Sequence, residues 1–197
     1  MKEPAPKRMD REARRAALLD AAARILRRRV PTPLTFEAIA AEAGVSPTLP
    51  YKYFDSVDDV AEALYRSTVG AVDDETDRLL ADPERSFDDT VRDSLGLWTD
   101  TMRRDGRVLM RLADGRAHPS LARVIDQRRE RAIAAWASRI EAEFGVDPVS
   151  ARIVAASLTA GSSAALQRVT RDRVDRDLVI ELFVAMARAQ GEAAAHR

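Results

Sequence analysis

Apolar residues recur along this chain at intervals of three and four, the spacing that places them on one face of an α-helix. Leu18, Ala22, Ile25 and Leu26 form such a stripe in the first expected helix, over residues 10–29. The same spacing continues to the end of the sequence, and no segment shows the strict apolar-polar alternation of a half-buried strand. The pattern predicts an all-α protein of about nine helices.

Beyond residue 56 the apolar stripes predict five long helices, with a short apolar piece at residues 108–112 between the second and the third. Ser56 and Asp59 have the spacing of a capping box, which opens the first of these helices. Gly145 ends the third, because glycine adopts the left-handed backbone of a helix end at little cost.

Short helical stretches separated by turn residues occupy residues 34–54. Thr35 is expected to cap a short helix that ends before Gly44. Ala40 lies four residues before Gly44, and a helix-turn-helix needs a small residue where its helices cross and a glycine in its turn. An ordinary helical hairpin would also use a turn glycine, so this spacing alone leaves both arrangements open.

Pro47 and Pro50 follow close together, although proline inside a helix costs about 3 kcal/mol. With Ser46 as N-cap, Pro47 takes the first helical position, where an N–H group would have no partner. Pro50 takes the fourth position and forfeits one hydrogen bond. The two prolines therefore predict a short, stiff helix that begins at Ser46.

Residues 34–64, with the sequence LTFEAIAAEAGVSPTLPYKYFDSVDDVAEAL, resemble the DNA-binding segment of the TetR (tetracycline-repressor) family. The shared features are a Thr-capped helix, Ile-Ala, Ala-Gly-Val-Ser, Tyr-x-x-Phe and a Ser-capped fourth helix. In the rest of the chain only the number and length of the helices match the family.

The resemblance implies a helix-turn-helix DNA-binding domain at residues 1–56, joined through the fourth helix to a ligand-binding and dimerisation domain at residues 57–197. It also implies a homodimer that pairs through the last two long helices. Ligand binding would move the fourth helix and reset the spacing of the two DNA-binding heads. Dimeric helix-turn-helix proteins read half-sites about 34–36 Å apart, so the operator should be roughly palindromic.

The family's base-reading positions fall on four residues here: Pro47, Thr48, Leu49 and Tyr51. None is Arg, Asn or Gln, the residues best suited to bidentate contacts with guanine or adenine. The resemblance therefore implies thymine-methyl contacts from Pro47 and Leu49, a hydrogen bond from Thr48, and Lys52 as a possible guanine donor.

Phosphate contacts would fall to Thr35 at its helix N-terminus, and to Ser46, Tyr51 and Tyr53. The alternative for Tyr51 is a core aromatic whose hydroxyl reaches the rim. Two residues depart from the family pattern. Pro50 stands where a larger aliphatic residue is usual, and Val57 where a phosphate-binding lysine is common.

The net charge of zero conceals an asymmetry between the two ends of the chain. Residues 1–34 contain ten Lys or Arg and four Asp or Glu, while the remainder contains 22 basic and 28 acidic residues. A basic head on an acidic body suggests contact with a polyanion, although uneven solvated helix faces would give the same counts. Basic residues from Lys7 to Arg15 are expected to attract DNA or enter its minor groove.

The absence of cysteine excludes disulfides and thiolate metal sites. The charged N-terminus has no apolar run after it, as a signal peptide would. The longest uncharged run, residues 153–167, has 15 residues and is too short and too polar for a membrane span. We therefore expect a soluble, cytoplasmic protein that associates with the nucleoid and not with a membrane.

A pocket for a small-molecule effector is expected among the helices of the second half. Its candidate walls are Trp98, Met102, Met110, Leu112, Trp136 and Ile140. The alternative is that these side chains are simply core. The small residues of AASLTAGSSAAL, residues 155–166, would let another helix approach closely, either in a dimer or within the chain.

The sequence gives little support for an enzyme. His118 and His196 are the two histidines, and neither has neighbours that suit a metal site or a catalytic triad. No HExxH, P-loop or GxSxG motif occurs. We expect neither a catalytic residue, nor a metal, nor a cofactor.

The interpretation favoured by the sequence is a repressor that binds a palindromic operator as a homodimer and is released by a small molecule of unknown identity. A same-fold activator, or a regulator controlled by a protein partner, is the first alternative. The second is an all-helical adaptor or enzyme that uses the helix-turn-helix only for packing.

Overall fold

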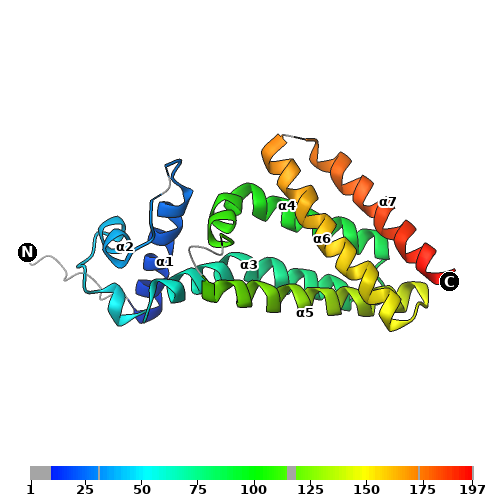
Figure 1. Ribbon diagram of the computed structural model, residues 1–197, viewed down its shortest axis with the longest axis horizontal. Coiled ribbons are helices and arrows are strands. Elements are labelled where there is room, and N and C mark those ends of the chain that lie inside the picture. Colours follow the sequence, from blue (N-terminus) through cyan, green and yellow to red (C-terminus); the bar gives the residue numbers. More distant parts are fainter. Residues whose placement is uncertain (1–9, 31, 115–118, 173, 197) are drawn as a thin grey trace, which may run out of the picture.

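The computed structural model describes residues 10–30, 32–114, 119–172 and 174–196, and in these the chain forms seven α-helices and one 3-10 helix (Figure 1). The elements are α1 (Arg11–Arg27), α2 (Phe36–Ala43), η1 (Pro50–Lys52), α3 (Val57–Ala81), α4 (Phe87–Leu112), α5 (Pro119–Phe144), α6 (Pro148–Asp172) and α7 (Arg176–Ala195). The all-α prediction is confirmed. The short piece expected at residues 108–112 is the end of α4, and one expected helix is only the 3-10 helix η1.

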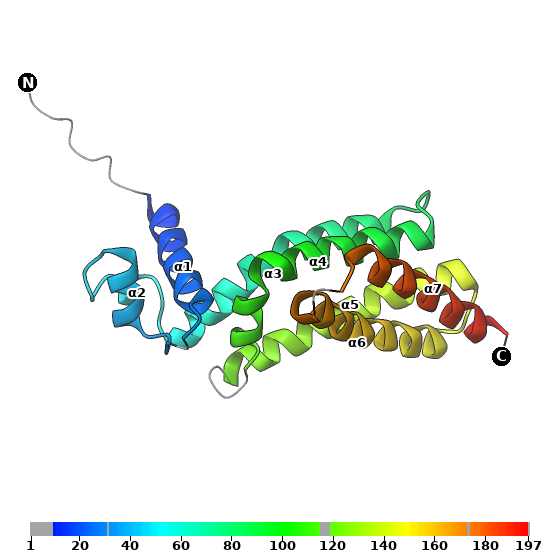
Figure 2. The same cartoon turned by 90° about the horizontal axis from the view of Figure 1, so that it is seen from above.

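The molecule is elongated, with a small head at one end (Figure 1). The head consists of α1, α2 and η1. Helix α3 runs from the head into the body, where α4 and α5 pack against it and α6 and α7 pack on α4 and α5. Seen from above, the last turns of α4 bend down toward α1 (Figure 2).

The predicted helix ends are confirmed by their capping geometry. The Thr35 hydroxyl accepts the N–H of Ala38 at 3.1 Å, and Gly44 ends α2 with φ of 66°. Ser56 and Asp59 form both hydrogen bonds of a capping box at the start of α3. Gly145, with φ of 65°, follows the end of α5. Each of these caps satisfies backbone groups that a helix end leaves without partners.

Two apolar cores hold the described residues together. The first joins α1, α2 and the start of α3, and it also contains residues from the end of α4 and the start of α5, among them Val108, Leu112 and Leu121. The second lies in the body among α4 to α7, around Phe87 and Ile140. The head therefore shares its core with part of the body. The division into a DNA-binding domain at residues 1–56 and a ligand-binding domain at residues 57–197 stays a prediction.

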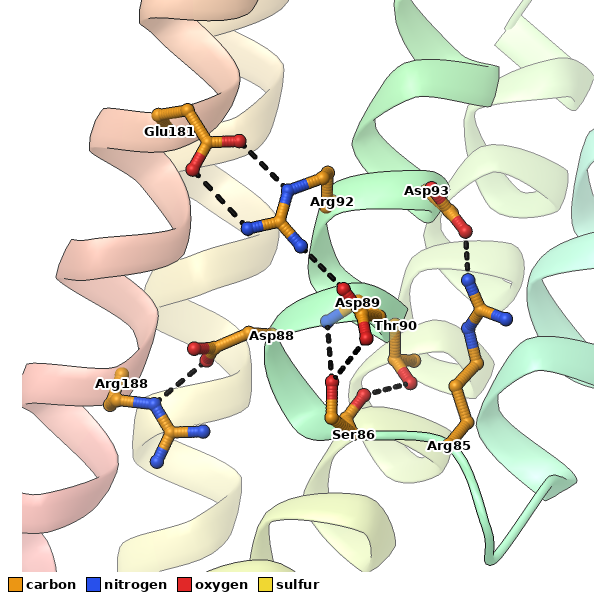
Figure 3. A network of polar contacts seen from close by, with 9 residues as sticks. All are labelled: Arg85, Ser86, Asp88, Asp89, Thr90, Arg92, Asp93, Glu181 and Arg188. Atoms are coloured by element: carbon orange, nitrogen blue, oxygen red, sulfur yellow. Dashed lines mark hydrogen bonds and ion pairs between the residues drawn. The ribbon is translucent and has the colours of Figure 1, made fainter.

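Polar contacts fix α4 against α7 (Figure 3). The Arg92 guanidinium donates to both oxygens of Glu181, at 2.8 and 3.2 Å, and Arg188 donates to Asp88 at 2.8 Å. Ser86 caps the start of α4 beside them. Because these side chains are partly exposed, the pairs set the register of the two helices more than they stabilise the fold.

One stretch of α6, Pro148–Leu166, is long and apolar enough to cross a membrane by length and composition alone. Such a stretch is weak evidence for a membrane, since helices of soluble proteins pass the same test. It packs against α5 and α7, yet only 28% of it is buried. Some apolar side chains of α6 are therefore exposed on the surface of the described part of the chain.

Candidate nucleic-acid interface and its link to the body

The segment that follows the Gly44 turn is a pair of tight turns, and the prediction of a helix beginning at Ser46 is wrong in form. The N–H of Leu49 bonds the Ser46 carbonyl at 3.0 Å, and the N–H of Lys52 bonds the Leu49 carbonyl at 3.0 Å. Both bonds span three residues, as in a 3-10 helix. Residues 50–52 form the helix η1.

The prolines explain this geometry. In an α-helix capped by Ser46, the first internal bond would run from the N–H of Pro50, which proline does not have. The chain closes with shorter-range bonds instead. The Ser46 hydroxyl lies 3.1 Å from the Thr48 hydroxyl and caps no backbone N–H of η1, so its predicted N-cap role is also wrong.

The turns expose most of the residues predicted to contact DNA. Pro50 and Phe54 are buried and anchor the segment, while Leu49 and Tyr53 are half-buried. Phe54 in the core agrees with expectation, and a proline fills the position where the family usually has a larger aliphatic residue. Five side chains of the segment are exposed: Ser46, Pro47, Thr48, Tyr51 and Lys52.

Tyr51 lies on the surface beside α2. It is 59% exposed, its ring meets Phe36 edge-on at 4.5 Å, and its hydroxyl donates to the Glu37 carboxylate at 3.4 Å. It is therefore not a core aromatic. A contact from Tyr51 to a phosphate requires its hydroxyl to leave Glu37. Tyr53 instead packs against the first core.

Much of the basic charge of the head is engaged within the protein. Arg24 donates to the Glu42 carboxylate at 2.7 Å, Arg28 forms a second ion pair with it, and Arg15 lies over the Phe54 ring at 5.0 Å. The hydrogen bond from Arg24 lowers the pKa of the Glu42 carboxyl, and the charges of Arg28 and Arg24 lower it further. Lys7, which was expected to attract DNA, lies outside the described residues.

The C-terminal end of α1 is capped by the body. The Arg107 guanidinium donates to the Arg27 carbonyl at 2.8 Å, and Arg111 donates to the Arg28 carbonyl at 2.7 Å. These carbonyls end a helix and lack partners within it, and positive charge is favourable at that end of the helix dipole. Helix α4 thereby holds the end of α1.

Asp105 forms the buried part of this link. It is 7% exposed, and it accepts hydrogen bonds from Arg27 at 2.6 Å and Arg104 at 2.7 Å. Burial by itself would raise the pKa of the Asp105 carboxyl, but the two guanidinium groups outweigh burial and hold this pKa below its usual value. The carboxylate is therefore charged when the head is attached to the body.

A cavity of about 740 Å³ lies in the body, lined by α3, α4, α5, α6 and one residue of α7. Trp98 and Trp136 line it, as expected; that they bind a ligand stays a prediction. Among the other four expected walls, Leu112 and Ile140 are buried in the two cores, Met110 is 60% exposed, and Met102 packs between the cores. The structure does not place these four on the cavity, because a helical stripe does not distinguish a cavity wall from core.

The sequence analysis missed a charged pair in the cavity wall. Arg128 of α5 donates to Asp73 of α3 at 2.7 Å, and its guanidinium lies 4.3 Å from the Trp98 ring centroid. Burial alone would lower the pKa of Arg128, but the bonds to Asp73 raise it. Burial raises the pKa of the neighbouring Tyr65. Because 55 residues separate Arg128 from Asp73, no local pattern reveals the pair.

No group of three or more His, Asp or Glu residues that could hold a metal ion occurs in the described part of the chain. His118, one of the two histidines, lies outside that part. The candidate functional features are the exposed turn segment, the cavity, and the contacts of α4 with α1 that join the head to the body.

Residues 18–64 match the model of a family described as bacterial regulatory proteins, tetR family. This match covers α2, the exposed turn segment, and parts of α1 and α3. No curated protein matches the chain significantly.

Solved structures of similar fold cover nearly the whole chain. A candidate transcriptional regulator from Pseudomonas aeruginosa PAO1 has a TM-score of 0.80 and 19% identity, over 96% of each chain. A TetR-like transcriptional regulator from Rhodococcus sp. RHA1 has a TM-score of 0.75 and 23% identity, over 91% of this chain and 96% of that one. The multidrug-binding protein EbrR, in complex with imidazole, has a TM-score of 0.62 and 21% identity, over 88% of this chain and 94% of that one. At these identities the likeness establishes the fold.

The link through Asp105 predicts a pH-dependent stability. We expect Asp105→Asn to lower the free energy of unfolding by about 1 kcal/mol at neutral pH, because Arg27 and Arg104 lose a charged acceptor. The pKa of Asp105 is lowered in the folded chain, so its contribution is present above the unfolded pKa of about 3.9 and is lost as the pH falls through the folded value. The difference between wild type and variant should therefore shrink below about pH 4.

Urea denaturation followed by tryptophan fluorescence, from neutral pH to about pH 3, measures this difference. The matched control is Asp126→Asn, which removes an exposed carboxylate paired with Arg129 on its own helix and should change little. A difference of the same size at both ends of the pH range would contradict the prediction.

Proposed function

We propose that the chain is a regulator of the TetR family, as the match of its N-terminal segment supports, and that it is a repressor released from DNA by a small molecule. In this proposal a homodimer binds a palindromic operator. The observation that carries it is the exposed turn segment of the head. This segment follows the Gly44 turn, and a duplex can reach its exposed side chains Pro47, Thr48 and Lys52.

The side chains of this segment suit apolar contacts and a few hydrogen bonds with base edges in the major groove. Pro47 and the exposed part of Leu49 can meet thymine methyl groups, and the Thr48 hydroxyl can hydrogen-bond either to a base or to Ser46. Lys52 is exposed, and its ammonium can donate to guanine. Thr35 at the N-terminus of α2 is positioned to meet a phosphate, because the helix dipole favours an anion there.

Exposed apolar side chains on α6 and α7, here together called the outer stripe, support the homodimer. Its large side chains recur every four residues on each helix and are 38% to 69% exposed: Val149 and Ile153 on α6, and Leu178, Leu182 and Met186 on α7. Exposure of such an apolar surface to water is unfavourable, so a surface of this kind often marks a binding interface. The same stripe on a second copy would complete a four-helix interface. Two heads would then read half-sites about 34–36 Å apart.

The cavity supports control by a small molecule, since 740 Å³ lies within the range of about 300–1,000 Å³ that is typical of ligand sites. EbrR, which is similar in fold, is a multidrug-binding protein whose structure holds imidazole. Helix α3 has 25 residues, about 37 Å, and runs from the head to the cavity wall. A ligand that displaces α3 would therefore move the head.

Selection of bound sequences from random duplexes tests the proposal. We expect a consensus of two inverted half-sites, with an affinity that falls steeply as salt rises, because phosphate contacts release counterions. A reporter behind this consensus should be expressed less when the protein is present. Duplex binding without a consensus, or no binding, would refute DNA recognition, and increased expression would indicate an activator.

Lys52→Ala should relax preference at one base pair of each half-site, at a cost of about 1–3 kcal/mol for the preferred base. Binding to the selected duplex and to duplexes substituted at each position measures this effect. Arg78→Ala is the matched control, since it removes the same charge from an exposed side chain near the far end of α3. An equal loss on every sequence would show that Lys52 contacts phosphate instead.

A double substitution in the outer stripe, Ile153→Glu with Leu182→Glu, should convert the dimer to a monomer, because it places four carboxylates within the proposed interface. Sedimentation velocity measures the assembly state, and operator affinity should fall with it. Met110→Glu adds a glutamate at a methionine of similar exposure outside the stripe and should remain dimeric. A double variant that stays dimeric would place the interface elsewhere.

A further inference from the structure

Glu37 brings a carboxylate to the surface that is proposed to read DNA. The exposed turn segment, residues 46–54, contains no acidic residue of its own. Glu37 lies in the first turn of α2 and is exposed, and its carboxylate accepts the hydrogen bond from the Tyr51 hydroxyl at 3.4 Å. Because Tyr51 occupies one of the expected base-reading positions, Glu37 lies beside the same part of the surface.

The Tyr51 ring is itself held in place, although it lies on the surface. It meets the Phe36 ring edge-on, with 4.5 Å between the ring centroids, and Phe36 is buried in the first core. A free glutamate side chain on a surface samples many rotamers, and fixing it costs conformational entropy. The hydrogen bond from Tyr51 offsets part of this cost and restrains the Glu37 carboxylate at the edge of the turn segment.

The chemistry of a carboxylate limits what it can contact on a duplex. An ionised carboxylate only accepts hydrogen bonds, and its two oxygens offer about four lone-pair sites. The Tyr51 hydrogen occupies one of these sites, so the Glu37 carboxylate can still accept a hydrogen bond from DNA. Phosphate groups carry charge of the same sign and repel it, so its favourable partner on a duplex is a donor on a base edge.

In the major groove only the amino groups of cytosine and adenine donate hydrogen bonds. Adenine carries its amino group next to the N7 acceptor, which repels a carboxylate, whereas cytosine presents its amino group without such an acceptor. Thymine and guanine present acceptors to the groove. A glutamate in the major groove therefore favours cytosine over the other three bases.

We propose that Glu37 is a specificity-determining residue that accepts a hydrogen bond from a cytosine amino group in each half-site, with Tyr51 as its positioning residue. The inference rests on the proposed function, since it takes the turn segment as the DNA-reading surface. It adds a cytosine preference to the thymine and guanine contacts expected of Pro47, Leu49 and Lys52. The same carboxylate weakens attraction to DNA of any sequence, because it is held near the phosphates.

The test uses the operator selected from random duplexes, with each C·G pair of one half-site replaced in turn by T·A. At one position the wild type should bind the replaced duplex about tenfold more weakly. Glu37→Gln should lower this factor to about twofold or less, because a neutral amide can accept from cytosine or donate to thymine. Replacing the same cytosine by 5-methylcytosine should leave wild-type binding unchanged, since this base has the methyl group of thymine but keeps the amino group. Glu84→Gln is the matched control: it removes the same charge from an exposed side chain in the turn between α3 and α4, and it should retain the preference.

Two further variants distinguish base reading from a structural role. Glu37→Ala should weaken operator binding about tenfold and strengthen binding to an unrelated duplex about twofold, because it removes repulsion from the phosphates. Tyr51→Phe retains the ring contact with Phe36 and should reduce the cytosine preference at the same position only. An equal loss on every duplex would show that the pair acts structurally and would overturn the proposal. A cytosine preference that persists in Glu37→Gln, or that is lost with 5-methylcytosine, would also overturn it.

The failure of this inference is distinguishable from the failure of the proposed function. A consensus of inverted half-sites in which no cytosine depends on Glu37 would overturn the role of Glu37 and leave the repressor function standing. Absence of a consensus would refute DNA recognition, and the role of Glu37 with it.

Discussion

The last turns of α4 pack into the head, and this contact decides how the head is held on the body. Val108 and Leu112 lie in the same core as Leu18 of α1, so the attachment has an apolar foundation. Asp105 adds a buried acceptor for Arg27 of α1. Because the carbonyls at the end of α1 receive hydrogen bonds from guanidinium groups of α4, moving one helix without the other would leave backbone groups unpaired.

Both helices that reach the head, α3 and α4, line the cavity, together with α5, α6 and one residue of α7. Thr76 lies on α3, which begins directly after the exposed turn segment, and Ser94 lies on α4, which ends in the core of the head. A ligand in this cavity would contact both helices and could alter how α3 and α4 sit against each other. A ligand shifts a conformational equilibrium only through differential affinity for the two states.

Features set within a few residues could be predicted from the sequence, and contacts between distant residues could not. The caps at Thr35, Gly44 and Ser56 depend on neighbours at most four residues away. The α-helix expected to begin at Ser46 is wrong: Pro47 lies in a turn and Pro50 begins the 3-10 helix η1, because the absent N–H of Pro50 favours 3-10 bonds. The pair Arg128–Asp73 spans 55 residues, and helical periodicity carries no information about it.

The internal use of positive charge in the head bears on how such a regulator would be switched. Arg24, Arg27 and Arg28 are paired with the two carboxylates of Glu42 and Asp105, so the excess of basic residues in the sequence overstates the positive charge that one head presents. A single weak head binds only briefly, whereas two linked heads bind with the product of their affinities and a high effective concentration. That advantage is lost when the spacing of the heads no longer matches the half-sites. In the proposed function, the spacing of the two heads would therefore be an effective point of control.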